Sequence, residues 1–118
     1  MTPNRHWFFD YTPHRTPIRL ANDSIVYSAG IGTVRFEPVV NGKVGRLLEF
    51  SRVLHVPDLR SNLLSVLYLT RNKHYHVSIA GSVMSFRQHR TLLFTATVNE
   101  RNAAYLDSRV VPAIELET

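Results

Sequence analysis

Apolar and polar residues alternate over many short stretches of this chain, and this alternation predicts β-strands. Within residues 33–37, the apolar side chains of Val34 and Phe36 fall on one face of an extended strand and their polar neighbours fall on the other. Similar stretches occupy residues 18–20, 25–27, 44–50, 52–56, 74–79, 83–86, 92–94 and 104–106. Many short strands with turns between them are typical of small barrels and rolled sheets. We therefore expect an all-β fold, a closed or partly open β-barrel.

Turn residues separate these stretches. Ala21-Asn22-Asp23-Ser24 lies between two extended runs and predicts a hairpin, because Asn and Asp tolerate a left-handed backbone and bond to their own main chain. Asn41-Gly42 predicts a second hairpin, since a type I′ turn needs positive φ at both central residues. Gly30-Ile31-Gly32 lies inside a strand pattern and indicates a bulge or a close backbone approach.

One short helix is expected around residues 62–72. Its apolar face comprises Leu63, Val66, Leu67 and Thr70, with Leu64 beside them. Ser61 is the expected N-cap, with Asn62 as the competing choice. Arg71 and Lys73 stand where cations favour a helix C-terminus.

The composition of the 118-residue chain is that of a single globular domain with its own core. It contains no cysteine, which excludes disulfides, thiolate metal sites and cysteine nucleophiles. Neither a membrane-spanning apolar run nor a secretory leader is apparent in the sequence, so we expect an intracellular, cytoplasmic protein without a membrane partner.

The formal net charge is +5, and only Lys43 and Lys73 of the 14 basic residues are lysine. Arginine makes bidentate contacts to phosphate, so nucleic acid is an alternative partner, although scattered charge does not demand one. The densest basic region is a possible basic patch of Arg71, Lys73, Arg87 and Arg90, with His74, His76 and His89. Tyr75 and Phe86 could stack on bases there. The preferred interpretation is that these two aromatic side chains belong to the core.

Metal and cofactor chemistry finds little support in the sequence. His74 and His76 share a strand face and His89 is nearby, but a zinc site needs three or four ligands and no acid completes the set. No Gly-x-Ser-x-Gly string occurs, and Gly30-Ile31-Gly32 lacks the third glycine of a dinucleotide loop. We expect neither a metal site nor a cofactor.

Three blocks of sequence carry a resemblance to a known family. They are Ile18-Arg19-Leu20-Ala21-Asn22-Asp23-Ser24, then Gly30-Ile31-Gly32-Thr33-Val34, then Val53-Leu54-His55-Val56-Pro57-Asp58-Leu59-Arg60-Ser61-Asn62-Leu63-Leu64-Ser65-Val66. In this order and spacing they resemble the Pol polyprotein of copia-type retrotransposons, in its retropepsin-like aspartic protease region. The third block is the specific one. The resemblance implies a β-barrel domain over residues 1–107, with residues 108–118 as a flexible tail.

The same resemblance carries expectations about activity. The family has an Asp-Ser-Gly-Ala motif followed by a run that Met1-Thr2-Pro3-Asn4-Arg5 matches, so the chain is expected to be truncated just after the catalytic motif. Ala21 to Ser24 corresponds to a flap-like turn. Ala103-Ala104-Tyr105-Leu106-Asp107 corresponds to a Gly-Leu-Tyr-x-Leu-Asp strand, with alanine in place of the glycine. No zinc-binding His/Cys arrangement of an integrase follows.

No catalytic residue is predicted in this chain. A retropepsin dimer works through two carboxyl groups that share a proton. Asp10 is expected to be an exposed acid, Asp23 a turn residue, and Asp58 a loop residue. The resemblance implies a non-catalytic fragment of a protease whose ancestral role was to cleave peptide segments of the polyprotein inside virus-like particles. A weak homodimer is the most self-association we expect. The alternative is a retained peptide- or RNA-binding β-barrel module.

Overall fold

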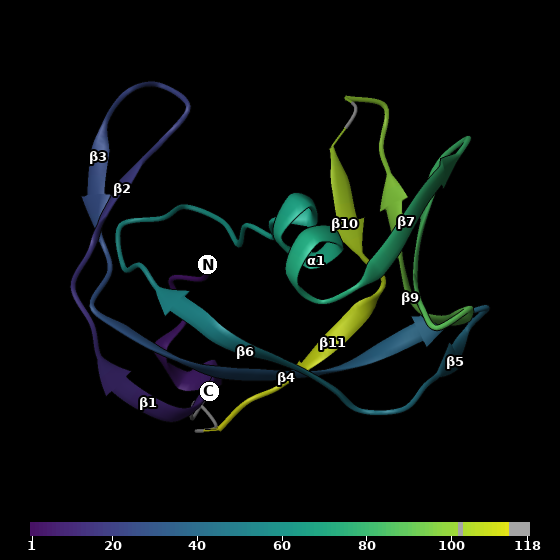
Figure 1. The fold of residues 1–118 in the computed structure, drawn as a ribbon, viewed down its shortest axis with the longest axis horizontal. Coiled ribbons are helices and arrows are strands. Elements are labelled where there is room, and N and C mark those ends of the chain that lie inside the picture. The colour runs from purple at the N-terminus through teal and green to yellow at the C-terminus, as the bar shows by residue number, and fades with distance from the viewer. Residues whose placement is uncertain (102, 114–118) are drawn as a thin grey trace. The chain divides into compact units, whose positions relative to one another are not determined.

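The computed structural model describes residues 1–101 and 103–113 and shows an all-β fold, as predicted from the sequence (Figure 1). The described elements are a 3-10 turn η1 (Arg5–Trp7), β1 (Phe8–Pro13), β2 (Pro17–Arg19), β3 (Ile25–Tyr27), β4 (Gly30–Val40), β5 (Lys43–Val44), β6 (Leu48–His55), α1 (Val66–Asn72), β7 (Tyr75–Ala80), β8 (Val83–Gln88), β9 (Thr91–Val98), β10 (Ala104–Leu106) and β11 (Ser108–Val111). None of the helices in these residues is long and apolar enough to cross a membrane.

The strands form three sheets. Strands β1, β5, β6 and β11 each pair with β4, strands β7 to β10 form an antiparallel sheet in the order β10-β9-β8-β7, and β2 pairs only with β3. In the described part of the chain none of these sheets closes on itself, so the closed form of the expected barrel is not found. The chain divides into two compact units: unit 1 holds residues 1–35, 49–64 and 110–118, and unit 2 holds residues 36–48 and 65–109.

In unit 1, β1 runs antiparallel to the first half of β4. Phe8 pairs with Val34, the register shifts between Phe9 and Thr12, and Thr12 then pairs with Ile31. The shift comes where the two strands approach closely. A Cβ on Gly32 would lie 2.8 Å from the Phe9 carbonyl oxygen, and a Cβ on Gly30 would overlap the ring of Tyr11. The close approach expected at these two glycines is therefore confirmed.

Both predicted hairpins are present. Strands β2 and β3 pair through Pro17 and Tyr27 at the open end, and the turn at residues 21–24 joins them. Asn41 and Gly42 join β4 to β5 with φ values of 53° and 75°, which is the backbone that a type I′ turn requires. The residue types within each turn, four residues in the first hairpin and two in the second, were sufficient to predict these connections.

The core of unit 2 is aromatic. Phe36, Phe86 and Phe94 are almost fully buried. The rings of Phe86 and Phe94 stack with centroids 4.4 Å apart, and Phe36 meets Phe94 edge-on at 5.5 Å. These side chains come from three strands, so their packing fixes the face that each strand turns to the interior.

The helix is shorter than predicted at its start. It begins after Ser65, whose side-chain oxygen accepts a hydrogen bond of 3.1 Å from the Tyr68 backbone N–H. The expected cap at Ser61 or Asn62 is wrong, because Asn62 and Leu63 bond instead to the first residues of the chain. The helical face predicted from Leu63 onward fails for the same reason, and Leu63 is 45% exposed. The side chain of Leu67 lies outside the described structure.

The first residues of the predicted tail form a strand. Ser108–Val111 forms β11, which pairs with β4. Four residues with two adjacent valines are too short a run to be recognised as a strand from sequence. Pairing with β4 stabilises the extended backbone of this segment. Residues 114–118 of the predicted tail lie outside the described residues.

Candidate functional site

The first residues of the chain add a short strand beside β6 in unit 1. The Thr2 N–H donates to the Leu54 carbonyl at 3.0 Å, and the Val56 N–H donates to the Thr2 carbonyl at 2.9 Å. Thr2 and His55 thus form a parallel bridge. Thr2 is 3% exposed, and Val56 is fully buried. The first residues of the chain therefore pack against the third block of the resemblance.

A second set of hydrogen bonds joins the same segment to the end of the third block of the resemblance, residues 53–66, which we call the motif block. The Thr2 hydroxyl donates to Asn62 Oδ1 at 2.6 Å, and Asn4 Nδ2 donates to the same oxygen at 3.3 Å. Met1 and Leu63 exchange two bonds of 2.8 and 2.9 Å through their backbone groups. Burial lowers the pKa of the Met1 amino group from its usual value. Residues 1–4 are thus hydrogen-bonded both to the backbone on either side of His55 and to Asn62 and Leu63.

His55 lies at the centre of an aromatic cluster in unit 1. Its Nδ1 lies 2.8 Å from the Tyr11 hydroxyl, and its ring centroid is 5.6 Å from those of both Phe8 and Tyr11. The Arg5 guanidinium stacks over Tyr11 at 3.6 Å. The ring also hydrogen-bonds to the backbone of Pro3, which has no N–H and so can only accept.

These contacts keep His55 neutral. Desolvation by burial lowers the pKa of His55 from its usual 6.5, and the nearby charge of Arg5 lowers it further, while the bond to Pro3 acts in the opposite direction. The ring of His55 thus connects the first residues of the chain with β1 through its contacts to Pro3 and Tyr11.

The acids of unit 1 do not form a catalytic pair in the described residues. Asp10 is exposed in the β1 bulge with φ 51°, beside a cavity of about 210 Å³ that Arg52 also lines. Asp23 is exposed and lies 3.8 Å from Arg19. Asp58 is exposed as well, and the exposed Glu49 pairs with Arg35 at 2.7 Å. The buried polar residues in the described chain are Thr2, Ser28 and His55, and none of them is an acid.

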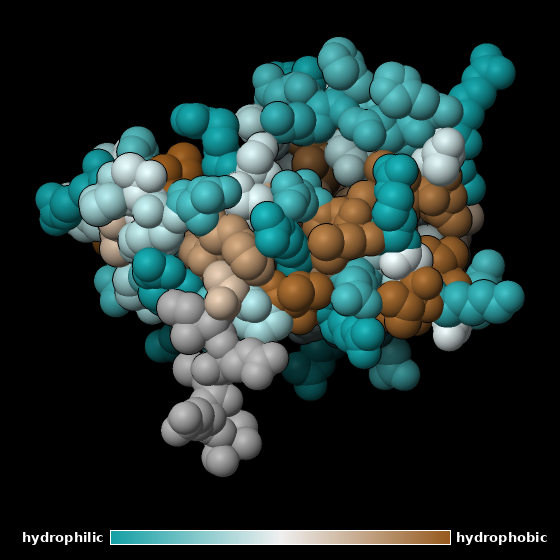
Figure 2. All heavy atoms as spheres, turned by 90° about the horizontal axis from the view of Figure 1, so that it is seen from below, coloured by the Kyte–Doolittle hydropathy of each residue, from teal (hydrophilic) through white to brown (hydrophobic). Residues whose placement is uncertain are grey.

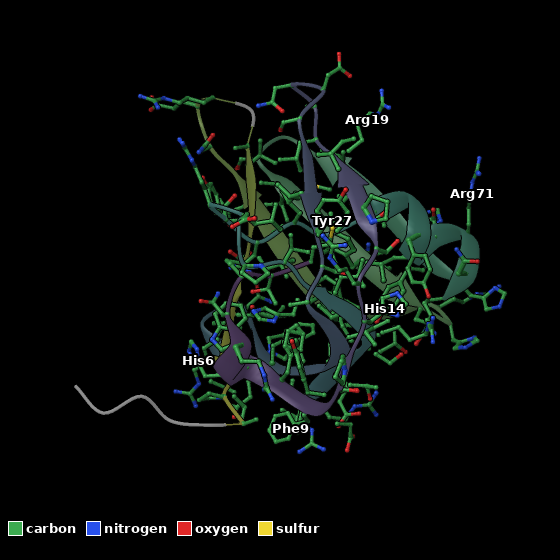
Figure 3. The ribbon with its side chains drawn as sticks, turned by 90° about the vertical axis from the view of Figure 1, so that its left-hand side faces the viewer. His6, Phe9, His14, Arg19, Tyr27 and Arg71 are labelled. Carbon is green, nitrogen blue, oxygen red and sulfur yellow. The ribbon has the colours of Figure 1, made fainter. Side chains whose placement is uncertain are left out.

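The flap-like turn is held by its own bonds. Asn22 Oδ1 accepts from the backbone and hydroxyl of Ser24, and the Asp23 N–H donates to the Leu20 carbonyl. Asp23 takes a positive φ of 65°. In Figure 3, Arg19 lies toward the tip of this hairpin and Tyr27 at its base, where the Arg15 guanidinium stacks over the Tyr27 ring at 4.0 Å.

Ser28 holds the base of the same hairpin, and no sequence pattern pointed to this residue. Its hydroxyl donates to the His14 carbonyl at 2.6 Å and accepts from the Thr16 N–H at 2.9 Å. The next residue, Ala29, donates to the His55 carbonyl at 2.8 Å. The hairpin base is therefore tied to the His55 cluster through consecutive backbone positions.

The four basic residues predicted as a patch lie in unit 2. Lys73 caps the C-terminus of α1, and its carbonyl accepts from the Gln88 side chain at 2.7 Å. His76 is directly opposite Arg87 in the β7–β8 pair. Arg90 follows in the turn to β9 with φ 66°. Tyr75 and Phe86 both contact Phe94 in the core, so they are not available as stacking platforms.

A shallow cavity of about 480 Å³ lies in unit 2 between the β4–β5 turn and strands β8 and β9. Val39, Val83, Leu92 and Asp107 contribute to its lining. Figure 2 shows apolar side chains at the surface where Figure 1 places β5 and the end of β4. The Asp107 carboxylate accepts from the hydroxyls of Thr95 and Thr97 at 2.7 and 2.8 Å. The resemblance picked out Asp107, but not this bonding.

Metal binding has no cluster to support it in the described residues, which contain no group of three or more His, Cys, Asp or Glu side chains suited to hold an ion. His74 has a positive φ of 59° and precedes β7, so the strand face that it was expected to share with His76 does not extend to it.

Comparison with known proteins gives one match. The model of a family described as "Pol polyprotein, beta-barrel domain" matches residues 1–75. These residues include the whole motif block, the flap-like turn and α1, whereas the strands from β8 onward lie beyond the match. No curated protein and no solved structure matches the chain.

Proposed function

This chain belongs to the family of Pol polyprotein β-barrel domains, and on that premise we propose that it is a non-catalytic part of the protease region of a copia-type retrotransposon polyprotein. The role that we assign to it is that of a folded β domain of the polyprotein. Peptide-bond hydrolysis is the ancestral activity of the region that it resembles.

The motif block supports the copia-type assignment. Its residues do not simply form a strand end and a loop. Leu54 and Val56 pair with Thr2, and Asn62 accepts from the Thr2 hydroxyl. The run at residues 1–4 and the motif block thus depend on each other physically in this chain.

One observation about burial supports the proposed lack of hydrolysis. An aspartic protease needs two carboxyl groups held close enough to share a proton. In the described residues of unit 1, the polar groups that the fold buries are a threonine, a serine and a neutral histidine. The three acids Asp10, Asp23 and Asp58 are all exposed. No two of these exposed acids form the close pair of carboxyl groups that the dyad requires.

The test is a protease assay on the purified chain. Peptides that span the junctions of the polyprotein are incubated with the chain at pH 4.5 and at pH 7, with and without a pepstatin-type inhibitor. We expect no cleavage that the inhibitor blocks. A matched variant, Asp10→Asn with Asp23→Asn and Asp58→Asn, keeps side-chain size and removes the three acids. Inhibitor-sensitive cleavage by the wild type that this variant lacks would contradict the proposal.

A further inference from the structure

The positive charge of the chain is concentrated in unit 2. Its basic residues are Lys43, Arg46, Arg71, Lys73, Arg87, Arg90, Arg101 and Arg109, and its acids are Glu37, Glu100 and Asp107. This excess of basic over acidic residues equals the +5 of the whole chain. Residues 59–99 contain no acid at all, and four of the eight basic residues lie in that run. Attraction for a polyanion therefore belongs to one unit of the chain.

The fold brings those four basic residues, the basic patch, to one end of the β7–β8 hairpin. The bond from Gln88 to the Lys73 carbonyl holds the end of β8 against the end of α1. Arg87 stands opposite His76, and Arg90 follows in the adjoining turn. Figure 3 shows Arg71 projecting away from the protein at the helix. Residues separated by up to nineteen positions in sequence thus share one end of one sheet.

The acids of unit 2 either bond to groups outside the basic patch or lie away from it. Glu37 pairs with Arg109 at 3.0 Å, and both oxygens of Asp107 accept threonine hydroxyls. Glu100 lies in the turn after β9, and Val98 there bonds to Ser82, at the opposite end of the β7–β8 hairpin. In the described chain, none of the salt bridges involves a residue of the basic patch.

We propose that the basic patch binds the phosphodiester backbone of a nucleic acid. Three of its four residues are arginine, whose planar guanidinium matches a phosphate with two parallel hydrogen bonds, whereas a lysine acts as a point charge. Tyr75 and Phe86 are packed against Phe94, so bases find no stacking platform from these two residues. Binding is consequently electrostatic and insensitive to base sequence. This inference does not depend on whether the chain is catalytically inactive.

The experiment is fluorescence anisotropy of labelled 20-nucleotide RNA titrated with the full chain. With about four phosphates neutralised, the affinity for a single strand is expected to fall roughly fifty-fold between 50 and 200 mM salt. Uridine-only and mixed-sequence RNA, and DNA of the same length, are expected to bind within about threefold of one another because the backbone is the common feature. No binding at 50 mM salt, or binding that salt does not weaken, would overturn the proposal.

Two charge-matched variants separate the patch from net charge. The patch variant carries Arg71→Gln, Lys73→Gln, Arg87→Gln and Arg90→Gln. The control variant carries Arg19→Gln, Arg46→Gln, Arg60→Gln and Arg101→Gln, all at exposed positions outside the patch. We expect at least a tenfold loss of affinity in the patch variant and less than threefold in the control. Equal losses would refute the patch as the site.

Two further arms keep the result interpretable. Circular dichroism of both variants establishes that each is folded. If the patch variant is unfolded, the single variants Arg71→Gln and Arg90→Gln, at exposed positions, replace it with an expected loss of about threefold each. Poly-glutamate of matched charge tests for an acidic protein partner. If it binds as tightly as RNA and displaces it, the proposed nucleic-acid partner is wrong.

Discussion

Thr2 and Asn62, sixty positions apart in the sequence, share a hydrogen bond of 2.6 Å between their side chains. The same hydroxyl accepts from the backbone N–H and the side-chain amide of Asn4 at 3.2 and 3.1 Å. One donor and two acceptor positions are all that a hydroxyl has, so Thr2 is fully satisfied. This saturated and buried hydroxyl connects the start of the chain to the end of the motif block.

Removing the hydroxyl is expected to destabilise unit 1. Thr2→Val keeps the branched shape but leaves the Asn62 and Asn4 side chains without their shared partner, at a cost of about 1–3 kcal/mol in the free energy of unfolding. Thr2→Ser keeps the hydroxyl and is expected to lose less than about 1 kcal/mol. Urea unfolding of the three proteins gives the comparison. A valine variant as stable as the wild type would show that the connection contributes nothing net.

The parts of the fold that could be predicted from sequence are those set by local geometry. Asn41 and Gly42 need positive φ in any context, and the turn formed as expected. Val34 and Phe36 alternate with polar neighbours, and both are buried in β4. Gly30 and its neighbours interrupt that pattern, and the interruption correctly indicated a close approach.

The start of the helix could not be predicted in this way. Ser61 and Asn62 have the right chemistry for a cap, and nothing near them in sequence argues against it. The Asn62 side chain bonds instead to Thr2, sixty positions earlier in the sequence. The helix is then capped by Ser65. Hydrogen bonds between residues far apart in sequence cannot be predicted from local helix propensity.

In the candidate site, too, local sequence patterns were informative and long-range contacts could not be predicted. The motif block was singled out from its sequence, and its residues up to Leu64 lie in unit 1. Its partner Tyr11, and Ser28 at the base of the neighbouring hairpin, carried no signal, because a tyrosine in an alternating stretch and a serine after a strand are ordinary residues. What distinguishes them is a bond to the His55 ring in one case and to the His14 carbonyl in the other.

Two glycines allow steric overlap to be compared with backbone strain. Gly30→Ala would drive a methyl group into the Tyr11 ring, whereas Gly42→Ala meets open space and faces only a φ of 75°. We expect Gly42→Ala to cost about 1–2 kcal/mol and Gly30→Ala to cost about 3 kcal/mol or more. Thermal unfolding measures both. The double variant Gly30→Ala with Tyr11→Ala should cost less than the sum of the two single changes, and additive losses would exclude the overlap with Tyr11 as the cause.

Phe94 is expected to be the most sensitive position in unit 2. It is fully buried and its ring contacts those of Phe36, Tyr75 and Phe86. Phe94→Ala should lower the free energy of unfolding by about 3–5 kcal/mol, because it removes a large apolar side chain and leaves a cavity. Tyr105→Ala, on the 66% exposed side chain of β10, is the control and should change stability by less than about 0.5 kcal/mol. Comparable losses in the two variants would contradict the aromatic core.

The stability of the chain should fall as the pH drops from 7.5 to 5.5, and His55 should cause part of that fall. The pKa of His55 is lowered in the folded protein, chiefly by burial, so the unfolded chain takes up a proton more readily. Above the unfolded value of about 6.5 both states are neutral and the full stability is present. As the pH falls through that value toward the lower folded pKa, protonation of the unfolded state draws the equilibrium toward unfolding.

His55→Gln removes the titrating group, and its stability should change less over this interval even if it is lower throughout. His76→Gln, at an exposed position of β7, controls for the loss of a histidine and should keep the wild-type difference. Unfolding free energies at the two pH values decide the matter, and an undiminished fall in His55→Gln would assign the pH dependence to other groups.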